Sequence, residues 1–289
     1  MSDEITPLLP ASDGLGVLYV VATPLGDAED LSPRAARILS EADLVLAEDT
    51  RRSGLLFARL GIARKDGLGF TSFHEHNEEQ RTPAVVERLL AGQSVALVSD
   101  AGTPLLSDPG YRLVRACREA GVRVRPVPGP SAPLAALSAC GLPPYPFSFL
   151  GFPPRKTSQA ERFFAAHRDT GATLVFFERK SRLRESLEAA HQALGDREFC
   201  IARELTKEYE EFLPGRLGAL EGMDLELRGE ITVVVGPASG NERTPEAEVA
   251  LALAEETKAG GKPKEVARRV AARVKGWTAK EVYAMHNPA

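Results

Sequence analysis

Carboxylate, imidazole and guanidinium side chains follow directly on several short apolar runs of this 289-residue chain. Carboxylates and imidazoles can act as general bases, and arginine side chains bind phosphate groups. Because an unpaired buried charge is costly, such residues must either form ion pairs or stand at the mouth of a pocket. The clusters are Ala47–Arg52, His74–Glu78, Ala202–Glu208 and Arg228–Glu230.

Three turns rich in glycine, proline and small residues form a second kind of candidate site. Small residues let backbone amide and carbonyl groups approach a ligand closely, which suits a compact polar cofactor, although any one of these turns could be turn chemistry alone. The sequence has no Gly-x-Gly-x-x-Gly after a strand and no Gly-Lys-Ser/Thr, so the common nucleotide-binding loops are not indicated. The three turns are Thr23–Asp27, Ser99–Pro104 and Pro128–Ala132.

A metal centre is not predicted. His74 and His76 form a His-x-His pair, but a catalytic zinc needs about three protein ligands and no third is evident. The three cysteines, Cys117, Cys140 and Cys200, form no Cys-x-x-Cys motif, so neither a disulfide framework nor a thiolate metal site is indicated. This cysteine usage fits a reducing cytoplasm.

Buried strands alternating with helices must position these clusters. Ser32-Pro33 and Thr82-Pro83 each predict a helix start, with a capping residue before a proline at the first helical position, and Gly92 predicts the end of the second helix. The alternation predicts an α/β fold with mainly parallel sheets. Strands are expected at Val17–Thr23, Leu44–Ala47, Phe70–Phe73, Val95–Ser99, Val122–Val127, Thr173–Phe177, Phe199–Ala202 and Ile231–Val235.

The domain organisation is predicted from composition and from the hinge at Pro126–Pro130. We expect an N-terminal α/β lobe over residues 1–127, a second α/β lobe over 128–240 and a helical module over 241–289, with Pro237–Pro245 as a linker. The fractions of 43% hydrophobic and 26% charged residues are ordinary for a globular protein and exclude a disordered chain. No apolar run reaches the roughly 18 residues of a membrane span, and Met1–Gly16 does not resemble a signal peptide, so we expect a cytoplasmic protein without a membrane partner.

The C-terminal segment differs in charge from the rest of the chain, whose formal net charge is −4 overall. Thr257–Ala289 contains eight Lys/Arg residues against two Glu, an excess of +6. Val266, Val270 and Val274 share one helix face, and Thr278-x-x-Glu281 predicts a capping box for a last helix. The segment is therefore either a solvated helical appendage or a module that binds a phosphate backbone. The candidate phosphate ligands off the valine face are Lys264, Arg268, Arg269 and Arg273.

Seven motifs in a fixed order resemble those of the ribosomal small-subunit methyltransferase I family, within the tetrapyrrole-methylase fold class. The resemblance covers about Val17 to Gly236, and the C-terminal basic module is similar to the one that the family carries. It implies two α/β lobes with a cofactor cleft between them, plus a small C-terminal helical module. The motifs are Thr23–Gly26, Ala47–Arg51, His74–Glu78, Val98–Pro104, Asp108–Tyr111, Pro128–Ala132 and Ala202–Lys207.

The resemblance implies methylation of the ribose 2′-hydroxyl of a cytidine in small-subunit (16S) ribosomal RNA, with S-adenosylmethionine as the methyl donor. It also implies a homodimer that acts on the small-subunit RNA or on the assembled 30S subunit. Two alternatives remain open: a tetrapyrrole (porphyrinogen) C-methyltransferase of the same fold, and a non-enzymatic nucleic-acid-binding protein whose loops hold a structural ligand.

The matched motifs give the candidate site residues. Glu48, Asp49 or His76 is the expected general base, a choice that the sequence leaves open, and Arg51 and Arg203 are expected to neutralise RNA phosphates. The expected cofactor-binding residues are Pro24, Asp100, Ala101, Gly102, Thr103, Ser131, Ala132, Leu205, Gly229 and Glu230.

Three departures from the family pattern bear on these assignments. Asp27 stands where the family commonly has Asn, and Ser131 where it often has Cys. The stretch Phe177–Leu183 replaces a Tyr-Glu-x-x-His-Arg-Leu pattern and has Ser181 in place of the histidine, so no essential imidazole is expected there.

Overall fold

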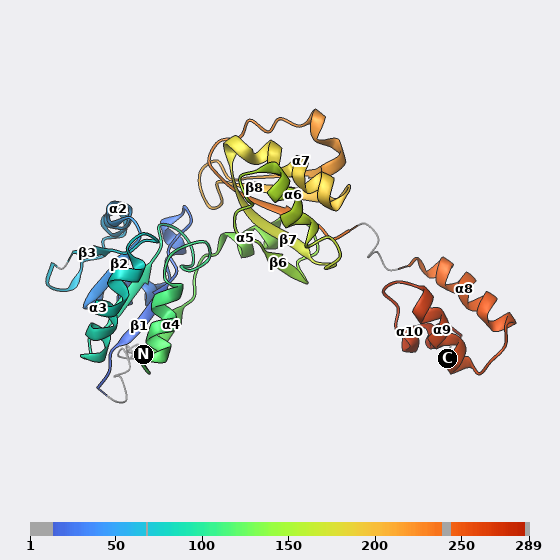
Figure 1. The fold of residues 1–289 in the computed structure, drawn as a ribbon, viewed down its shortest axis with the longest axis horizontal. Coiled ribbons are helices and arrows are strands. Elements are labelled where there is room, and N and C mark those ends of the chain that lie inside the picture. The colour runs from blue at the N-terminus through green and yellow to red at the C-terminus, as the bar shows by residue number, and fades with distance from the viewer. Residues whose placement is uncertain (1–13, 68, 239–243, 287–289) are drawn as a thin grey trace, which may run out of the picture.

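Five parallel strands form the first sheet of the computed structural model, which describes residues 14–67, 69–238 and 244–286 (Figure 1). The strand order is β3-β2-β4-β1-β5. The central strands are apolar on both faces and buried apart from the partly exposed Val20, as in sheets that helices cover on both sides. The expected strands are confirmed as β1 Val17–Val21, β2 Leu44–Ala47, β3 Phe70–Ser72, β4 Val95–Val98 and β5 Arg123–Val127.

Four helices pack against this sheet: α1 Pro33–Glu41, α2 Thr50–Leu60, α3 Glu78–Leu90 and α4 Tyr111–Glu119. The Ser32 cap is confirmed, since its hydroxyl oxygen accepts from the Ala35 amide at 3.1 Å. The predicted start at Thr82-Pro83 is wrong, because α3 begins a turn earlier with two glutamates that favour a helix N-terminus. The Thr82 hydroxyl donates to the Glu78 carbonyl inside the helix. Gly92, at φ +86°, follows the last turn as expected.

The second sheet has the order β6-β7-β10-β8-β9 and corrects the expectation of mainly parallel sheets. Only β6 and β7 pair in parallel, whereas the β7–β10, β10–β8 and β8–β9 pairs are antiparallel. A short loop joins β8 to β9, and short connections produce antiparallel neighbours. The strands are β6 Phe147–Phe149, β7 Thr173–Arg179, β8 Glu198–Arg203, β9 Glu211–Arg216 and β10 Glu230–Val235, of which β6 and β9 were not expected.

Three helices accompany the second sheet, namely α5 Ala132–Ala139, α6 Thr157–Ala165 and α7 Leu183–Leu194. Phe164, Phe176, Leu187 and Phe199 are fully buried in the core between α6, α7 and the sheet. Short 3-10 helices lie at Ala28–Asp30, Lys65–Gly67, Lys180–Arg182 and Leu217–Gly222.

The C-terminal module consists of α8 Glu246–Lys258, α9 Pro263–Arg273 and α10 Ala279–His286. The predicted valine face is confirmed, because Val266 and Val270 are buried in a core with Val249 and Leu253, against which Val274 also packs. The capping box is confirmed by the Thr278 amide, which donates to the Glu281 carboxylate at 2.8 Å, and by the return bond at 3.2 Å.

Two expectations fall wholly or partly beyond the described residues. Only the last three residues of the segment Met1–Gly16 are described. The expected domain boundary between residues 240 and 241 is not among the described residues, and neither is most of the expected linker Pro237–Pro245. Within the described parts of the chain, no helix combines the length and apolar composition that crossing a bilayer requires.

Candidate functional site

The three glycine- and proline-rich turns meet at the carboxyl ends of β1, β4 and β5. Thr23 and Gly102 exchange two backbone hydrogen bonds, at 2.8 and 3.0 Å, and so join the first turn to the second. The Thr103 hydroxyl donates to the Pro130 carbonyl at 2.9 Å and joins the second turn to the third. Gly102 has φ +80°, a conformation that glycine adopts without strain. The turns therefore form one hydrogen-bonded unit.

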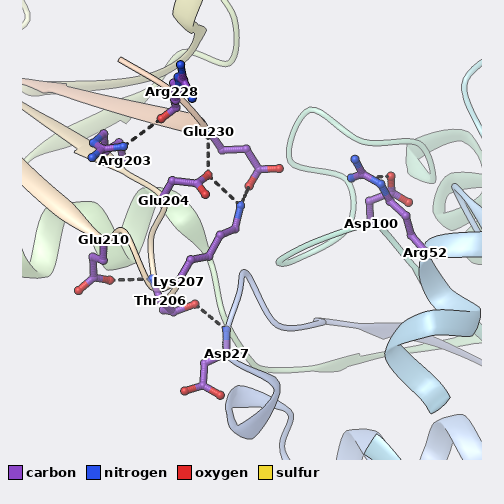
Figure 2. Close-up of polar contacts among 10 residues, drawn as sticks. All are labelled: Asp27, Arg52, Asp100, Arg203, Glu204, Thr206, Lys207, Glu210, Arg228 and Glu230. Carbon is purple, nitrogen blue, oxygen red and sulfur yellow. Dashed lines mark hydrogen bonds and ion pairs between the residues drawn. The ribbon is translucent and has the colours of Figure 1, made fainter. Parts of the chain in front are cut away.

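These turns also contact the segment that follows β8 of the second sheet. The Asp27 amide donates to the Thr206 hydroxyl at 3.1 Å, a bond drawn in Figure 2. Gly26 lies so close to Lys207 that an added Cβ would stand 2.2 Å from Lys207 Cγ. Leu25 packs against the apolar cluster that contains Leu205. The Asp27 carboxylate accepts from the Glu29 amide, as the family's Asn could also do, so this departure leaves the turn intact.

A cavity of about 700 Å³ lies between the two lobes. Seven of the expected site residues are on its wall, and they come from both sheets and from the hinge. Figure 2 shows Arg52 and Asp100 facing Glu230 across it. The first lobe and hinge contribute Leu25, Glu48, Arg52, Asp100, Ala101, Asp108 and Ala132. The second lobe contributes Phe152, Phe177, Glu178, Arg179, Lys180, Ser181, Leu205, Gly229, Glu230, Ile231 and Thr232.

The other four expected cofactor residues are not on this wall. Gly102 and Thr103 instead hold the turns together through the bonds described above. Pro24 follows Thr23 in the first turn, and Ser131 is the buried residue immediately before α5. These residues shape the loops that carry the wall.

The second-lobe side of the cavity depends on a network around Glu204 (Figure 2). The Glu204 carboxylate accepts from the Glu230 amide at 2.9 Å and from Lys207 Nζ at 3.0 Å. These hydrogen bonds, the one from the Glu230 amide first, lower the pKa of Glu204. Gly229 has φ +95°, and a Cβ there would lie 2.4 Å from the Glu204 side chain. The network therefore requires a glycine at position 229.

Three carboxyl groups lie on the first-lobe side. Burial, reinforced by the charge of Asp100, raises the pKa of Glu48. Burial also raises the pKa of Asp100, although that carboxylate accepts from the Asp49 amide at 3.0 Å and pairs with Arg52 at 3.2 Å. Burial and the negative charge of Glu48 raise the pKa of Asp108 to about 7. A carboxyl group in a cavity whose pKa is shifted as far as that of Asp108 is typical of a functional site.

The expected catalytic residues separate into one on the wall and three away from it. Glu48 lines the cavity. The Asp49 carboxylate caps α2, because it accepts from the amides of Arg51 at 2.8 Å and Arg52 at 3.4 Å. Arg51 is exposed, and the His76 ring, 83% exposed, lies 3.4 Å from Glu75.

The expected RNA-binding residues also differ from one another. Arg203 Nε donates to Glu211 at 2.7 Å, so its charge is already paired. Arg269 and Arg273 bind Glu256 of α8, at 2.7 and 2.8 Å. The positive excess counted from Thr257 onward left out the glutamates of α8. From Glu246 to His286 there are eight basic and six acidic residues, so the net charge of the module is only +2. Lys264 and Arg268 are exposed.

Sequence reasoning missed several wall residues. Asp108 belongs to the Asp-Pro-Gly-Tyr motif, which is indistinguishable from a turn in sequence. Arg52 is adjacent to Arg51, and the sequence indicated a role for Arg51 alone. Glu178 is buried, accepts from the Ser186 hydroxyl and lies 3.5 Å from Arg182. Phe152 packs against Phe177 with ring centroids 5.5 Å apart. Ser181 stands on the wall, at the position where the family has a histidine.

Within the described residues, no group of three or more His, Cys, Asp and Glu side chains has an arrangement suited to a metal ion.

Comparison with known proteins defines the class. Residues 17–221 match the family model of the tetrapyrrole (corrin/porphyrin) methylases. A crystal structure of diphthine synthase has a TM-score of 0.60 at 20% identity and covers 76% of this chain and 90% of its own. The uroporphyrin III C-methyltransferase of Thermus thermophilus has a TM-score of 0.52 at 21% identity and covers 76% and 97%. The fold is that of the tetrapyrrole methylases, methyltransferases that use S-adenosylmethionine as the methyl donor.

Closer relatives define the family more narrowly. The ribosomal RNA small subunit methyltransferase I of Mesorhizobium japonicum is 49% identical over 83% of this chain and 79% of its own. The proteins of the same name from Escherichia coli O157:H7 and Micromonospora olivasterospora are each 41% identical, over 84% and 93% of this chain and 86% of their own. The chain belongs to the ribosomal RNA small subunit methyltransferase I family, as the motif order predicted.

Proposed function

We propose that this chain transfers a methyl group from S-adenosylmethionine to the ribose 2′-hydroxyl of a cytidine in small-subunit ribosomal RNA. One observation carries the proposal: the cavity between the lobes brings strand-end turns, carboxyl groups and basic side chains to one place. The names of the relatives support RNA rather than a tetrapyrrole as the acceptor.

The cavity suits the methyl donor in size and in chemistry. A volume of about 700 Å³ is in the range of pockets that hold cofactors of this size. Leu25, Ala101 and Leu205 offer apolar surface, while Asp100 and Glu230 offer negative charge to a ligand with ammonium and sulfonium groups. We propose that Asp100, Ala101, Ala132, Leu205, Gly229 and Glu230 contact the donor, and that Pro24, Gly102, Thr103 and Ser131 position the turns around it.

Methyl transfer from a sulfonium is an in-line displacement, so this enzyme's main task is alignment. Holding the acceptor oxygen, methyl carbon and sulfur in line can supply roughly 7–11 kcal/mol of the barrier. The donor supplies the activated methyl group. Arg179 and Lys180 stand on the wall and can neutralise the phosphates that flank an RNA acceptor, whereas Arg52 on the same wall is paired with Asp100.

The C-terminal module is proposed to bind RNA backbone through fewer residues than the sequence indicated. Lys264 and Arg268 lie one turn apart on the exposed side of α9, whereas Arg269 and Arg273 are engaged with Glu256. The two exposed residues, together with Arg51 near the cavity, are the better candidates. Arg203 is proposed to hold β8 against β9 through Glu211.

Several further assignments belong to this proposal. We propose a homodimer in the cytoplasm that acts on naked small-subunit RNA or on the assembled 30S subunit. We also propose domain limits of 1–127, 128–240 and 241–289. Their support is that β5 ends the first sheet at Val127, β6 to β10 form the second sheet, and α8 begins at Glu246.

Methylation with isotope-labelled donor tests the function. Naked 16S RNA and 30S particles are incubated with the enzyme, and nucleosides are mapped by mass spectrometry. We expect a single cytidine methylated on its ribose. Methyl transfer to a porphyrinogen without RNA methylation would support the tetrapyrrole alternative. Absence of donor binding in isothermal titration would support the non-enzymatic one.

A further inference from the structure

Asp108 ends a backbone segment held in an unfavourable conformation. Leu105 has φ +75° and Ser107 φ +70°, although neither is a glycine. A residue in this conformation persists only where its surroundings determine it. This strain lies directly before a residue on the cavity wall, and strained backbone of this kind gathers at functional sites.

A buried glutamate holds the other side of Asp108. Glu78, at the start of α3, accepts from the amides of Gly110 at 3.0 Å and Arg112 at 2.9 Å. These amides belong to the start of α4, where backbone donors have no partner within the helix. Pro109, between Asp108 and this anchor, is buried. Asp108 is therefore fixed in place from both ends.

The charged groups around Asp108 come from the ends of β2 and β4, from α2 and from the second lobe. Glu48 follows β2 and Asp100 follows β4, and both repel a charge on Asp108. Arg52 of α2 is paired with Asp100, and a hydrogen bond with Ser99 favours the charged form of Asp108. The second lobe presents Glu178, Arg179, Lys180 and Glu230 to the same cavity.

We propose that Asp108 is the general base that takes the proton from the acceptor hydroxyl, a role that rests on the proposed function. The hydroxyl oxygen forms a bond to the methyl carbon as the carbon–sulfur bond breaks, and the hydroxyl proton passes to the Asp108 carboxylate. The products are neutral S-adenosylhomocysteine, the methyl ether and a neutral Asp108. The sulfonium and carboxylate charges disappear together, so the step is balanced.

The other candidates are less suited to this task. The Asp49 carboxylate is occupied by the amides that it caps, and the His76 ring points into solvent. Burial raises the pKa of Asp100 as well, but its carboxylate already accepts from the Asp49 amide and pairs with Arg52, so its oxygens are occupied. A base works best when its pKa lies near the working pH, and the pKa of Asp108 is about 7.

Single-turnover methylation with saturating donor, over pH 5.5 to about 9, tests this role. Asp108→Asn should lower the rate by about 10²–10⁴-fold, the usual contribution of a positioned base, while donor affinity by titration stays within a few-fold. The wild-type rate should rise tenfold per pH unit below about 7 and then level off, and the residual rate of Asp108→Asn should not show this rise. Asp30→Asn, an exposed aspartate in the 3-10 helix after the first turn, is the matched control and should behave as wild type.

A second variant separates Asp108 from its neighbour. Glu48→Gln removes a charge that raises the pKa of Asp108, so the inflection of the rate profile should move to lower pH. A profile that loses its inflection in Glu48→Gln but keeps it in Asp108→Asn would make Glu48 the base and overturn the proposal. Loss of donor binding in Asp108→Asn would overturn it too, by making Asp108 a cofactor ligand. A wild-type enzyme that binds donor but methylates no RNA would instead refute the proposed function.

Discussion

Replacing Asp108 by asparagine should stabilise the folded protein above pH 7. Burial beside Glu48 raises the pKa of this carboxyl from 3.8 to about 7. Between these two pH values the carboxyl is protonated in the folded state and ionised in the unfolded state. The folded wild type therefore loses stability as the pH rises from about 4 to 7. A difference of about three pKa units corresponds to at most ~4 kcal/mol at 1.36 kcal/mol per unit. Because Asp108 is only partly buried, we expect about half of this.

Thermal unfolding at several pH values checks this expectation. A gain of about 2 kcal/mol corresponds to a rise in Tm of roughly 4–8 °C for a folded unit of about 150–250 residues. Asp108→Asn should show that rise at pH 8 and almost none at pH 4, and Asp30→Asn should show neither. An Asp108→Asn protein that is less stable than wild type at pH 8, or equally stabilised at every pH, would refute the reasoning.

Three further predictions follow from the contacts described above. Gly229→Ala should weaken donor binding at least tenfold in titration, because its Cβ would displace Glu204, whereas Gly222→Ala, with open space around its Cβ, should bind normally. Changing both Lys264 and Arg268 to Ala should lower the salt slope of RNA affinity by about two units if each contacts one phosphate, and parallel salt lines would contradict this. Glu78→Ala should cost about 3 kcal/mol in denaturant unfolding and lower the methylation rate, since it frees the amides that hold the Asp108 segment; an unchanged rate would separate the anchor from catalysis.

Most strands that the sequence predicted are buried, with apolar and β-branched residues that run without interruption, and the half-buried edge strands β3 and β5 of the first sheet were predicted as well. The two that it missed are the edge strands of the second sheet. β9 contains Pro214 and Gly215, residues that normally argue against a strand, and an edge tolerates them because one side of the strand needs no partner. β6 is only three residues long and follows a proline-rich stretch that indicates a loop.

The antiparallel pairing of the second sheet could not be predicted from local patterns. β10 comes last in the chain but inserts between β7 and β8, and only the complete set of buried faces determines that position. The error at Thr82-Pro83 has a similar origin, because the local capping signal lost to contacts made by Glu78 with another helix.

The sequence indicated the parts of the candidate site that turns form, but not the side chains whose properties depend on burial. The strand-end turns with small residues were found because glycine and proline leave a clear signal. Asp49 was proposed from the sequence as a catalytic candidate without weighing its capping role, although an aspartate before a helix start is a common capping signal. Asp108 was missed because its raised pKa arises first from burial and then from the charges of Glu48 and Asp100, and these come together only in the folded protein.

The strand order of the first sheet sets the moment at which this part of the chain can fold during synthesis. β1 is made first but lies between β4 and β5, with Leu18 opposite Val95 on one side and Val124 on the other. Its buried residues thus leave the ribosome long before either neighbour exists, and such distant pairings form slowly. Until Val127 has emerged, β1 lacks at least one of its two neighbouring strands and leaves apolar surface that chaperones can bind. Slowing translation before Val127 has left the ribosome should therefore prolong chaperone association, whereas a pause placed after its emergence should not.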